Sequence, residues 1–537
     1  MVLVRDCVSQ FANAVSAKSL TLKQAVVIAG VMEFVGALFL GSSVTDTVRS
    51  NIIDPNDYDN QSDVLMLGML CASIGSSVWV NMATKFGMPV STTHATIGAV
   101  VGFGIAFGGA DSINWGTWDD GVIGIVVGWG IAPVLAGLAA VAIYLITDFA
   151  VLRTDDSFNR ALKIFPLYVF FSFMLISFFM FYKGFGRYES TFQNMTWGSL
   201  GNPWPMIFIA AGVGLAGGLF THFFLVRYLR KKYQDLPDDP DNVILSPSKV
   251  DPEAAQKAHV EANAPENWPW YKKYTITAFN YLFGGLDKDV VSIDANDAHM
   301  VSVHENAKSY GTRTEKIFST MQIFTSSFSA LAHGSNDVAN AVGPFSAVFY
   351  FWNNDSGIVS SKSDVPTWIL AYGGFFIVLG LAMQGWRMMA VMGNHLTKIT
   401  PSRGFAMEMG AVVAVLIASD RGLPVSTTQC IIGATIAVGL VNPGVWRAIN
   451  WRMAFISFTA WVITVPAAGL VSGLIFSFVA FSPKIQDCSG AFGEVPLISG
   501  DNGTTWQPFC VPRPYGFMYT DEFYTNASIL VQSSYNS

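Results

Sequence analysis

The chain has 537 residues, of which 51% are hydrophobic and only 13% are charged, and its formal net charge at pH 7 is -7. Soluble proteins carry about 25% charged residues, so this composition, with a mean hydropathy of +0.41, excludes an ordinary soluble protein. The sequence has no basic stripe typical of nucleic-acid binding. It also has no metal-ligand cluster or nucleophile–base pair typical of an enzyme. We therefore expect neither a cofactor nor catalytic residues.

Apolar runs of about 20 residues recur along the chain, and each is long enough to cross the roughly 30 Å hydrocarbon core of a bilayer as a helix. They predict an all-α polytopic membrane protein with about 12 spans, the first of them truncated. Residues 316–351 are too long for one straight span, and Gly334, Gly343 and Pro344 predict a broken helix there. The predicted spans are residues 2–17, 22–41, 63–84, 88–109, 121–148, 161–182, 204–228, 316–351, 367–386, 404–420, 425–441 and 450–481.

The orientation of these spans is predicted by two signals. With the N-terminus outside, the loops on the inner side carry an excess of Lys and Arg, as the positive-inside rule requires. Cys488 and Cys510 then lie outside in the polar tail, where an oxidising compartment would allow them to pair. The plasma membrane is the expected location, and an internal membrane is the alternative. The second signal for this orientation is that it places five glycosylation sequons outside. These sequons begin at Asn60, Asn194, Asn354, Asn502 and Asn526.

An internal repeat relates the two halves of the chain. The Pro-Val-Ser-Thr-Thr sequence at residues 89–93 recurs at residues 424–428, and each copy is followed by a tryptophan, 38 and 35 residues after its serine. We interpret these residues, Trp129 and Trp461, as packing or interface anchors. Because seven spans precede the second repeat, which begins with the span at 316–351, that repeat crosses the membrane in the opposite sense. Inverted repeats are typical of transporters that work by alternating access.

The repeats and the polar segments divide the chain into five regions. The predicted regions are a first transmembrane repeat at 1–148, two connecting transmembrane helices at 149–228, a cytosolic polar loop at 229–314, a second and inverted repeat at 315–481, and an extracellular or lumenal tail at 482–537.

A polar motif interrupts the apolar residues of the span at 316–351. Asp337 lies between Asn336 and Asn340, and such groups persist in a membrane where they face a cavity or a bound ion. Carboxylate and amide oxygens suit a hard cation, so the three residues predict a Na⁺ site. Glu33, in the middle of the second span, is a further candidate cation ligand or proton carrier. Glu408 is left open between a functional role and a place at the interface.

Three consecutive hydroxyl side chains follow the proline in each repeat copy, which is the composition of a helix N-terminus. Free backbone N–H groups and the positive end of the helix dipole bind anions there without lysine or arginine. Two such helix ends facing each other would surround a tetrahedral oxyanion. The predicted phosphate-binding residues are Ser91, Thr92, Thr93, Ser426, Thr427 and Thr428.

At these residues the chain resembles the inorganic phosphate transporter (PiT) family of sodium- or proton-coupled phosphate symporters. The resemblance covers the chain apart from its polar tail. It is most specific from Gly334 to Pro344 and from Pro401 to Gln429, where an Asn-Asp motif precedes Pro-Val-Ser-Thr-Thr. The resemblance implies phosphate as the cargo, whereas the residues alone indicate a cation-coupled anion carrier.

The first half departs from the family pattern. The family's Asn-Asp pair falls at Arg5 and Asp6, so the resemblance implies Asp6 as the cation ligand of this half. A second register would place Gln10 where the acid belongs. We prefer the first register because Asp6 and Ser91 are 85 residues apart, close to the 89 residues between Asp337 and Ser426.

The sequence therefore predicts a secondary active transporter that imports inorganic phosphate together with Na⁺, or with H⁺ in its place. One alternative is another oxyanion such as sulfate. The other is a phosphate sensor that has kept the fold without transport. The expected partners are phosphate, the coupling cation and the lipid bilayer, and the sequence leaves formation of a homodimer open.

Overall fold

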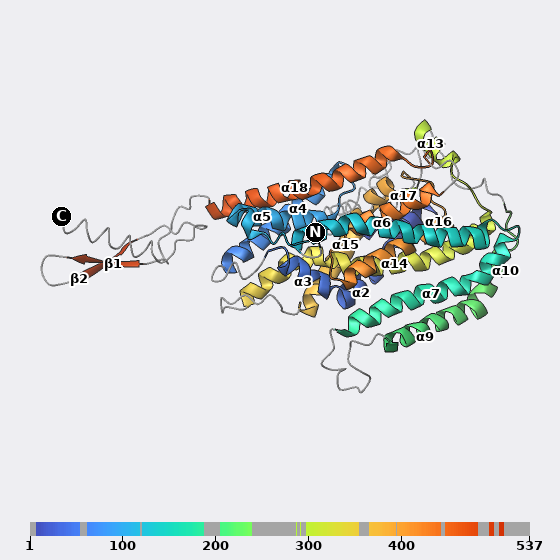
Figure 1. Ribbon diagram of the computed structural model, residues 1–537, viewed down its shortest axis with the longest axis horizontal. Helices are drawn as coiled ribbons and strands as arrows, with labels where there is room; N and C mark the ends of the chain where they lie inside the picture. Colours follow the sequence, from blue (N-terminus) through green and yellow to red (C-terminus); the bar gives the residue numbers. More distant parts are fainter. Residues whose placement is uncertain are drawn as a thin grey trace, which may run out of the picture.

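The computed structural model is a long bundle of helices (Figure 1). It describes residues 7–53, 62–118, 121–186, 204–238, 286, 290–291, 297–353, 365–393, 395–441, 446–481, 493–498 and 504–509. The α-helices are α1 Cys7–Ser16, α2 Leu22–Leu40, α3 Ser42–Ser50, α4 Ser62–Lys85, α5 Thr92–Gly108, α6 Gly121–Thr147, α7 Ser157–Gly186, α9 Trp204–Phe220, α10 Val226–Tyr233, α13 Ala298–Glu305, α14 Thr312–Asn353, α15 Thr367–Met392, α16 Pro401–Asp420, α17 Thr427–Leu440 and α18 Trp451–Phe481. Two π-helical turns, η3 Asp148–Leu152 and η4 Thr221–Leu225, extend α6 and α9. In the tail, β1 Gly493–Ile498 pairs antiparallel with β2 Thr504–Phe509, with Gly493 opposite Phe509.

The lengths and apolar composition of the helices fit the predicted membrane spans. Among the described residues, eight helical segments are long and apolar enough to cross a membrane, and the two shorter apolar helices α5 and α17 accompany them. The helix α14 has 42 residues and carries the polar motif. In Figure 1, α7 and α9 lie side by side at one edge of the bundle and α18 lies along the opposite edge. The polytopic helical fold predicted from the hydropathy pattern is confirmed.

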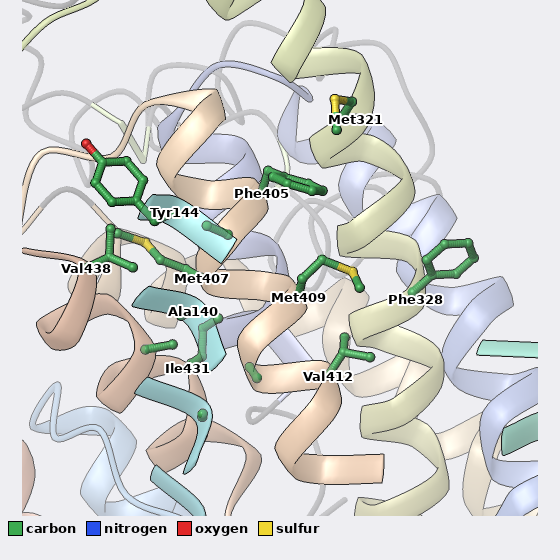
Figure 2. Close-up of a cluster of buried hydrophobic side chains, with 14 of the residues drawn as sticks. Ala140, Tyr144, Met321, Phe328, Phe405, Met407, Met409, Val412, Ile431 and Val438 are labelled. Atoms are coloured by element: carbon green, nitrogen blue, oxygen red, sulfur yellow. The ribbon is translucent and has the colours of Figure 1, made fainter. Parts of the chain in front are cut away.

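Three apolar clusters make up the interior, and α14 contributes to all of them. One cluster joins α6, α16 and α17, a second joins α4, α5 and α18, and a third joins α1, α2 and α15. Figure 2 shows the first cluster, in which Met409 and Val412 of α16 point towards α14 while Met407 points towards Val438 of α17. The central position of α14 brings its polar residues into contact with both halves of the chain.

The two repeats exchange partners, because the short helix of each repeat packs on the long helix of the other. The helix α5 packs on α18, and its counterpart α17 packs on α6. Glycines permit this close approach, since a Cβ at these positions would press on the facing helix. Equivalent positions of the two repeats make equivalent contacts. The contacts with α18 are those of Gly98 with Val465, Gly102 with Gly469 and Gly75 with Ser472. The corresponding contacts with α6 are those of Gly433 with Pro133, Ala437 with Gly137 and Gly410 with Ala140. We call α4, α5 and α18 the first bundle, and α6, α16 and α17 the second bundle.

The prediction that residues 316–351 form a broken helix is wrong. The helix α14 runs from Thr312 to Asn353 without interruption and contains Pro344. A proline inside a helix leaves the carbonyl four residues earlier without its N–H donor. That carbonyl belongs to Asn340, and the hydroxyl of Thr96 on α5 donates to it at 3.3 Å. A neighbouring helix thus supplies the missing donor, as membrane helices with internal proline require.

The end of the predicted polar loop is packed against the helices. Residues 297–311, which we call the strap, include α13, and Asp297 caps this helix by accepting from the N–H of His299 at 3.1 Å. The hydroxyl of Tyr310 donates to Asp148 of η3 at 2.7 Å and lies 3.1 Å from the hydroxyl of Tyr144. Burial, with Tyr144 and Asp148 nearby, raises the pKa of Tyr310, so this side chain keeps its proton as a donor.

The strap also contacts the loops that connect the helices of the second repeat. Lys398 donates to the hydroxyl of Ser309 at 2.7 Å, and the buried guanidinium of Arg403 donates to the carbonyl of Lys308 at 2.7 Å. The amide of Asn450 contacts the sulfur of Met300 at 3.2 Å. The strap therefore ties η3, the loop before α16 and the loop before α18 together at one end of the bundle.

Replacing Tyr310 with phenylalanine is expected to destabilise this end of the bundle. The variant removes a donor to a carboxylate that is 2% exposed, and hydrogen bonds to charged groups contribute about 1.5–3 kcal/mol. The measurement is the thermal midpoint of the purified protein in detergent. Tyr372→Phe is the control, because Tyr372 is 52% exposed on α15. Equal midpoints for the two variants would show that the strap contact adds no stability.

Candidate functional site

The two hydroxyl triplets begin the short helices, as predicted from their composition. Ser91 is the N-cap of α5 and accepts from the N–H of His94 at 3.4 Å. Ser426 is the N-cap of α17 and accepts from the N–H of Gln429 at 3.3 Å. The threonine hydroxyls that follow are buried at the start of each helix. Two helix N-termini, each able to bind an anion, thus lie inside the protein.

The polar motif of α14 lies against the start of α5. The side-chain amide of Asn340 donates to the hydroxyls of Thr92 at 3.2 Å and Thr93 at 3.0 Å. The hydroxyl of Thr92 donates to Oδ2 of Asp337 at 3.3 Å. The carboxylate predicted to bind a cation and the hydroxyls predicted to bind phosphate are therefore direct neighbours.

The same motif also reaches the loop that precedes α17. The amide of Asn336 donates to the carbonyl of Val425 at 2.7 Å and to Oδ1 of Asp337 at 2.9 Å. Thr93 of α5 donates to the same Val425 carbonyl at 3.3 Å. The two helix N-termini and the polar motif of α14 form one connected site. We call this the central site.

Glu33 extends the central site through a histidine. Nδ1 of His333 lies 2.8 Å from Oε2 of Glu33 on α2, and its Nε2 lies 3.0 Å from Oδ2 of Asp337, one turn along α14. All three side chains are at most 2% exposed. The imidazole of His333 therefore links the carboxylates of Glu33 and Asp337 inside the protein. No role is predicted for His333 from the sequence, although its position four residues before Asp337 places both on one helix face.

Buried polar atoms at the centre of the site lack a hydrogen-bond partner among the described residues. They include Oδ1 of Asn336, Oδ1 of Asn340 and Oγ1 of Thr427. An unpaired polar atom in a buried place is costly, so these atoms indicate a ligand. The two amide oxygens beside the Asp337 carboxylate suit a hard cation such as Na⁺. The hydroxyl of Thr427, at the N-terminus of α17, suits an oxyanion.

Trp129 contacts residues of both repeats next to the central site. Its indole N–H donates to the carbonyl of Pro424, just before the second hydroxyl triplet, at 3.1 Å. Its ring stacks on that of His94 with the centroids 3.8 Å apart. The interpretation of Trp129 as a packing residue was incomplete, because one tryptophan positions elements of both repeats. Its counterpart Trp461 has an indole N–H without a hydrogen-bond partner in the described part of the chain.

The two tryptophans therefore offer a matched pair of variants. Trp129→Phe is expected to raise the KM for phosphate about three- to tenfold, because the loop before α17 loses one hydrogen bond of about 1 kcal/mol. Trp461→Phe removes an N–H that makes no such bond and is expected to leave the KM within about twofold. The measurement is the concentration dependence of phosphate uptake for each variant. Equal effects of the two substitutions would contradict this role of Trp129.

Glu408 lies in a second polar cluster inside the protein. It is fully buried and accepts from Gln322 at 3.1 Å, Thr325 at 2.6 Å and Ser326 at 2.8 Å. Ser19, just after α1, donates to Gln322 at 2.6 Å. The cluster joins α14, α16 and the chain that leads into α2.

Some predicted residues lie outside the described part of the chain. These are Asp6, the sequon residues Asn60, Asn194, Asn354, Asn502 and Asn526, and the cysteines Cys488 and Cys510. The cation ligand of the first repeat, glycosylation and the disulfide therefore stay predictions. In the residues that the structure describes, no group of three or more His, Cys, Asp or Glu side chains has the arrangement of a metal site.

Comparison with known proteins identifies the family. A model described as "Phosphate transporter family" matches residues 4–472. The chain belongs to the phosphate transporter family. This member is 32% identical to the phosphate-repressible phosphate permease pho-4 of Neurospora crassa, over 89% of this chain and 95% of that protein. It is 26% identical to the sodium-dependent phosphate transporter 2 of Xenopus laevis, over 88% of this chain and 94% of that protein.

A solved structure has the same fold as this phosphate transporter family member. It is described as "The sodium-dependent phosphate transporter" and matches with a TM-score of 0.65 and 25% identity, over 90% of this chain and 96% of that one. These comparisons confirm the resemblance read from the two motifs and the integral membrane character of the chain. They also confirm that it is not an enzyme, because the family and its relatives are transporters and permeases.

Proposed function

We propose that this chain is a secondary active transporter that imports inorganic phosphate together with Na⁺ by alternating access. The observation that carries the proposal is the bond network of the central site, in which Asp337 contacts Thr92 at 3.3 Å and Asn340 contacts Thr93 at 3.0 Å. Through these bonds the motif that suits a cation is in direct contact with the N-terminus of α5, which suits phosphate.

Charge explains why the two ions would bind together. Asp337 is 1% exposed, and a phosphate anion beside a buried carboxylate would meet strong repulsion in this low-dielectric place. A Na⁺ ion on the oxygens of Asn336, Asp337 and Asn340 removes that repulsion. Phosphate then binds well only when the cation is present. By the same coupling, bound phosphate increases the affinity of the site for the cation.

The exchange of helices between repeats supplies the moving parts. The first bundle brings the N-terminus of α5 to the central site and the second bundle brings that of α17, while α14 touches both. Tilting one bundle against the other would open the site to one side of the membrane at a time. With the predicted orientation and a plasma-membrane location, the inward Na⁺ gradient would drive import.

Proton coupling is the alternative that a specific observation favours. His333, between Glu33 and Asp337 at 2.8 and 3.0 Å, could carry a positive charge to the same carboxylate that Na⁺ would neutralise. A relative whose name states sodium dependence favours Na⁺. The uptake experiment below therefore distinguishes coupling to Na⁺ from coupling to H⁺.

The test is uptake of radiolabelled phosphate by transporter-deficient cells that express the chain. Sodium is present or replaced by choline, at two pH values, and unlabelled sulfate or arsenate competes. We expect sodium-dependent uptake that arsenate inhibits and sulfate does not. Uptake that needs acid rather than sodium would establish the proton alternative, and equal competition by sulfate would establish a broader oxyanion carrier. Phosphate binding without uptake, in a chain that reaches the membrane, would identify a sensor.

A further inference from the structure

The carbonyl group of Asn340 is held by a side chain of another helix. In a regular helix this oxygen would accept from the N–H of residue 344, but Pro344 has none. The hydroxyl of Thr96 on α5 donates to it at 3.3 Å, and Thr96 is fully buried. A buried carbonyl without a donor is destabilising, so the Thr96 hydroxyl satisfies a group that α14 itself cannot.

Asn340 is thereby attached to α5 at two points. Its carbonyl accepts from Thr96, while its side-chain amide donates to Thr92 and Thr93, one turn earlier on the same helix. The opposite end of that amide, Oδ1, has no hydrogen-bond partner among the described residues and lies in the predicted cation site. A shift of α5 relative to α14 must therefore displace an atom of the cation site.

The internal repeat offers a comparison within the chain itself. The residue equivalent to Thr96 is Ile431 on α17, which has no hydroxyl. In the preferred register of the first half, the residue equivalent to Pro344 is Asn13 on α1, which has an N–H. Proline and hydroxyl are thus present together in one half and absent together in the other. This pairing indicates that the hydroxyl of Thr96 replaces the N–H donor that Pro344 lacks.

We propose that Thr96 is a positioning residue that couples the cation site on α14 to the phosphate-binding end of α5. The proposal rests on the proposed function, in which Na⁺ and phosphate bind to these two elements. When phosphate binds to the N-terminus of α5, the hydrogen bonds that join Asn340 to Thr92, Thr93 and Thr96 fix the position of Asn340. Its Oδ1 then faces the cation. Without the hydroxyl, the backbone of Asn340 loses its link to α5, and the remaining hydrogen bonds between α5 and the polar motif of α14 are made by side chains that are able to rotate.

The test measures how strongly Na⁺ promotes phosphate binding. The dissociation constant of phosphate is determined on the purified full chain, in Na⁺ and in choline, and the ratio of the two values is the coupling factor. Thr96→Val keeps the shape of the side chain and removes the hydroxyl, and we expect its coupling factor to fall about fivefold, the equivalent of one hydrogen bond. Thr96→Ser keeps the hydroxyl and is expected to retain most of the coupling.

A second substitution separates positioning from simple stability. Pro344→Ala returns an N–H to residue 344, so the carbonyl of Asn340 regains a donor within α14. In the double variant Thr96→Val with Pro344→Ala, we expect the thermal midpoint to recover while the coupling factor stays low, because the link from Thr96 to the backbone of Asn340 is still missing.

The outcomes are distinct. A Thr96→Val protein with the wild-type coupling factor would overturn the role of Thr96 and leave the proposed function standing. Full recovery of coupling in the double variant would also overturn it, since a satisfied carbonyl would then suffice. A wild-type chain whose phosphate binding ignores Na⁺ would overturn Na⁺ coupling and, with it, this inference.

Discussion

Replacing Asp337 with asparagine is expected to abolish sodium-dependent phosphate uptake. The substitution keeps the size of the side chain and removes the negative charge that the predicted cation site needs. Removing one partner of a buried charge pair costs about 3–5 kcal/mol, so we expect uptake to fall at least about 100-fold. The measurement is initial uptake of radiolabelled phosphate in sodium and in choline, corrected for the amount of protein at the membrane.

The control for Asp337→Asn is the same chemical change at an exposed place. Asp155 lies in the loop between η3 and α7 and is exposed, so Asp155→Asn is expected to transport like the wild type. If Asp337→Asn reaches the membrane and keeps its sodium-dependent uptake, the cation does not depend on this carboxylate. The assignment of the central site would then be wrong.

Gly334→Ala is expected to have the second large effect, because α2 and α14 touch through their backbones at this glycine. A Cβ on Gly334 would overlap the carbonyl of Glu33, and a Cβ on Gly36 would overlap the carbonyl of Leu331. A side chain could rotate away, but backbone atoms cannot, so the helices must separate. Overpacking costs about 1–3 kcal/mol, and separation would also draw Glu33 away from His333.

We therefore expect Gly334→Ala to lower both the thermal midpoint and the rate of phosphate uptake. The matched control is Gly130→Ala on α6, where nothing lies within 4 Å of the added Cβ. In that helix alanine is favoured over glycine by about 1 kcal/mol, so no loss is expected. A Gly334→Ala protein with normal midpoint and normal uptake would show that the contact between α2 and α14 is looser than the structure indicates.

Local signals in the sequence identified the parts of the central site. The composition Pro-Val-Ser-Thr-Thr predicted a helix start, and Ser91 and Ser426 are the N-caps. A carboxylate between two asparagines in an apolar run predicted a buried polar site, and Asp337 is 1% exposed. These predictions succeed because capping and burial depend on a few neighbouring residues.

The contacts between distant residues could not be predicted in the same way. Trp129 donates to a carbonyl 295 positions later in the chain, and His333 contacts a glutamate 300 positions earlier. The continuity of α14 through Pro344 depends on a hydroxyl from α5, and the glycines and the proline of α14 gave no sign of it. The internal repeat predicted which helices are equivalent. It did not predict that each short helix packs on the long helix of the other repeat.

We propose above all that Na⁺ and phosphate bind side by side at α5, α14 and α17 and cross the membrane together. The most direct measurement uses the purified protein in sealed vesicles with an imposed inward Na⁺ gradient and equal phosphate on both sides. We expect phosphate to accumulate inside above its external concentration, and we expect this accumulation to stop when the Na⁺ gradient is collapsed. Phosphate that only equilibrates, or that accumulates equally well without a Na⁺ gradient, would contradict Na⁺-coupled transport.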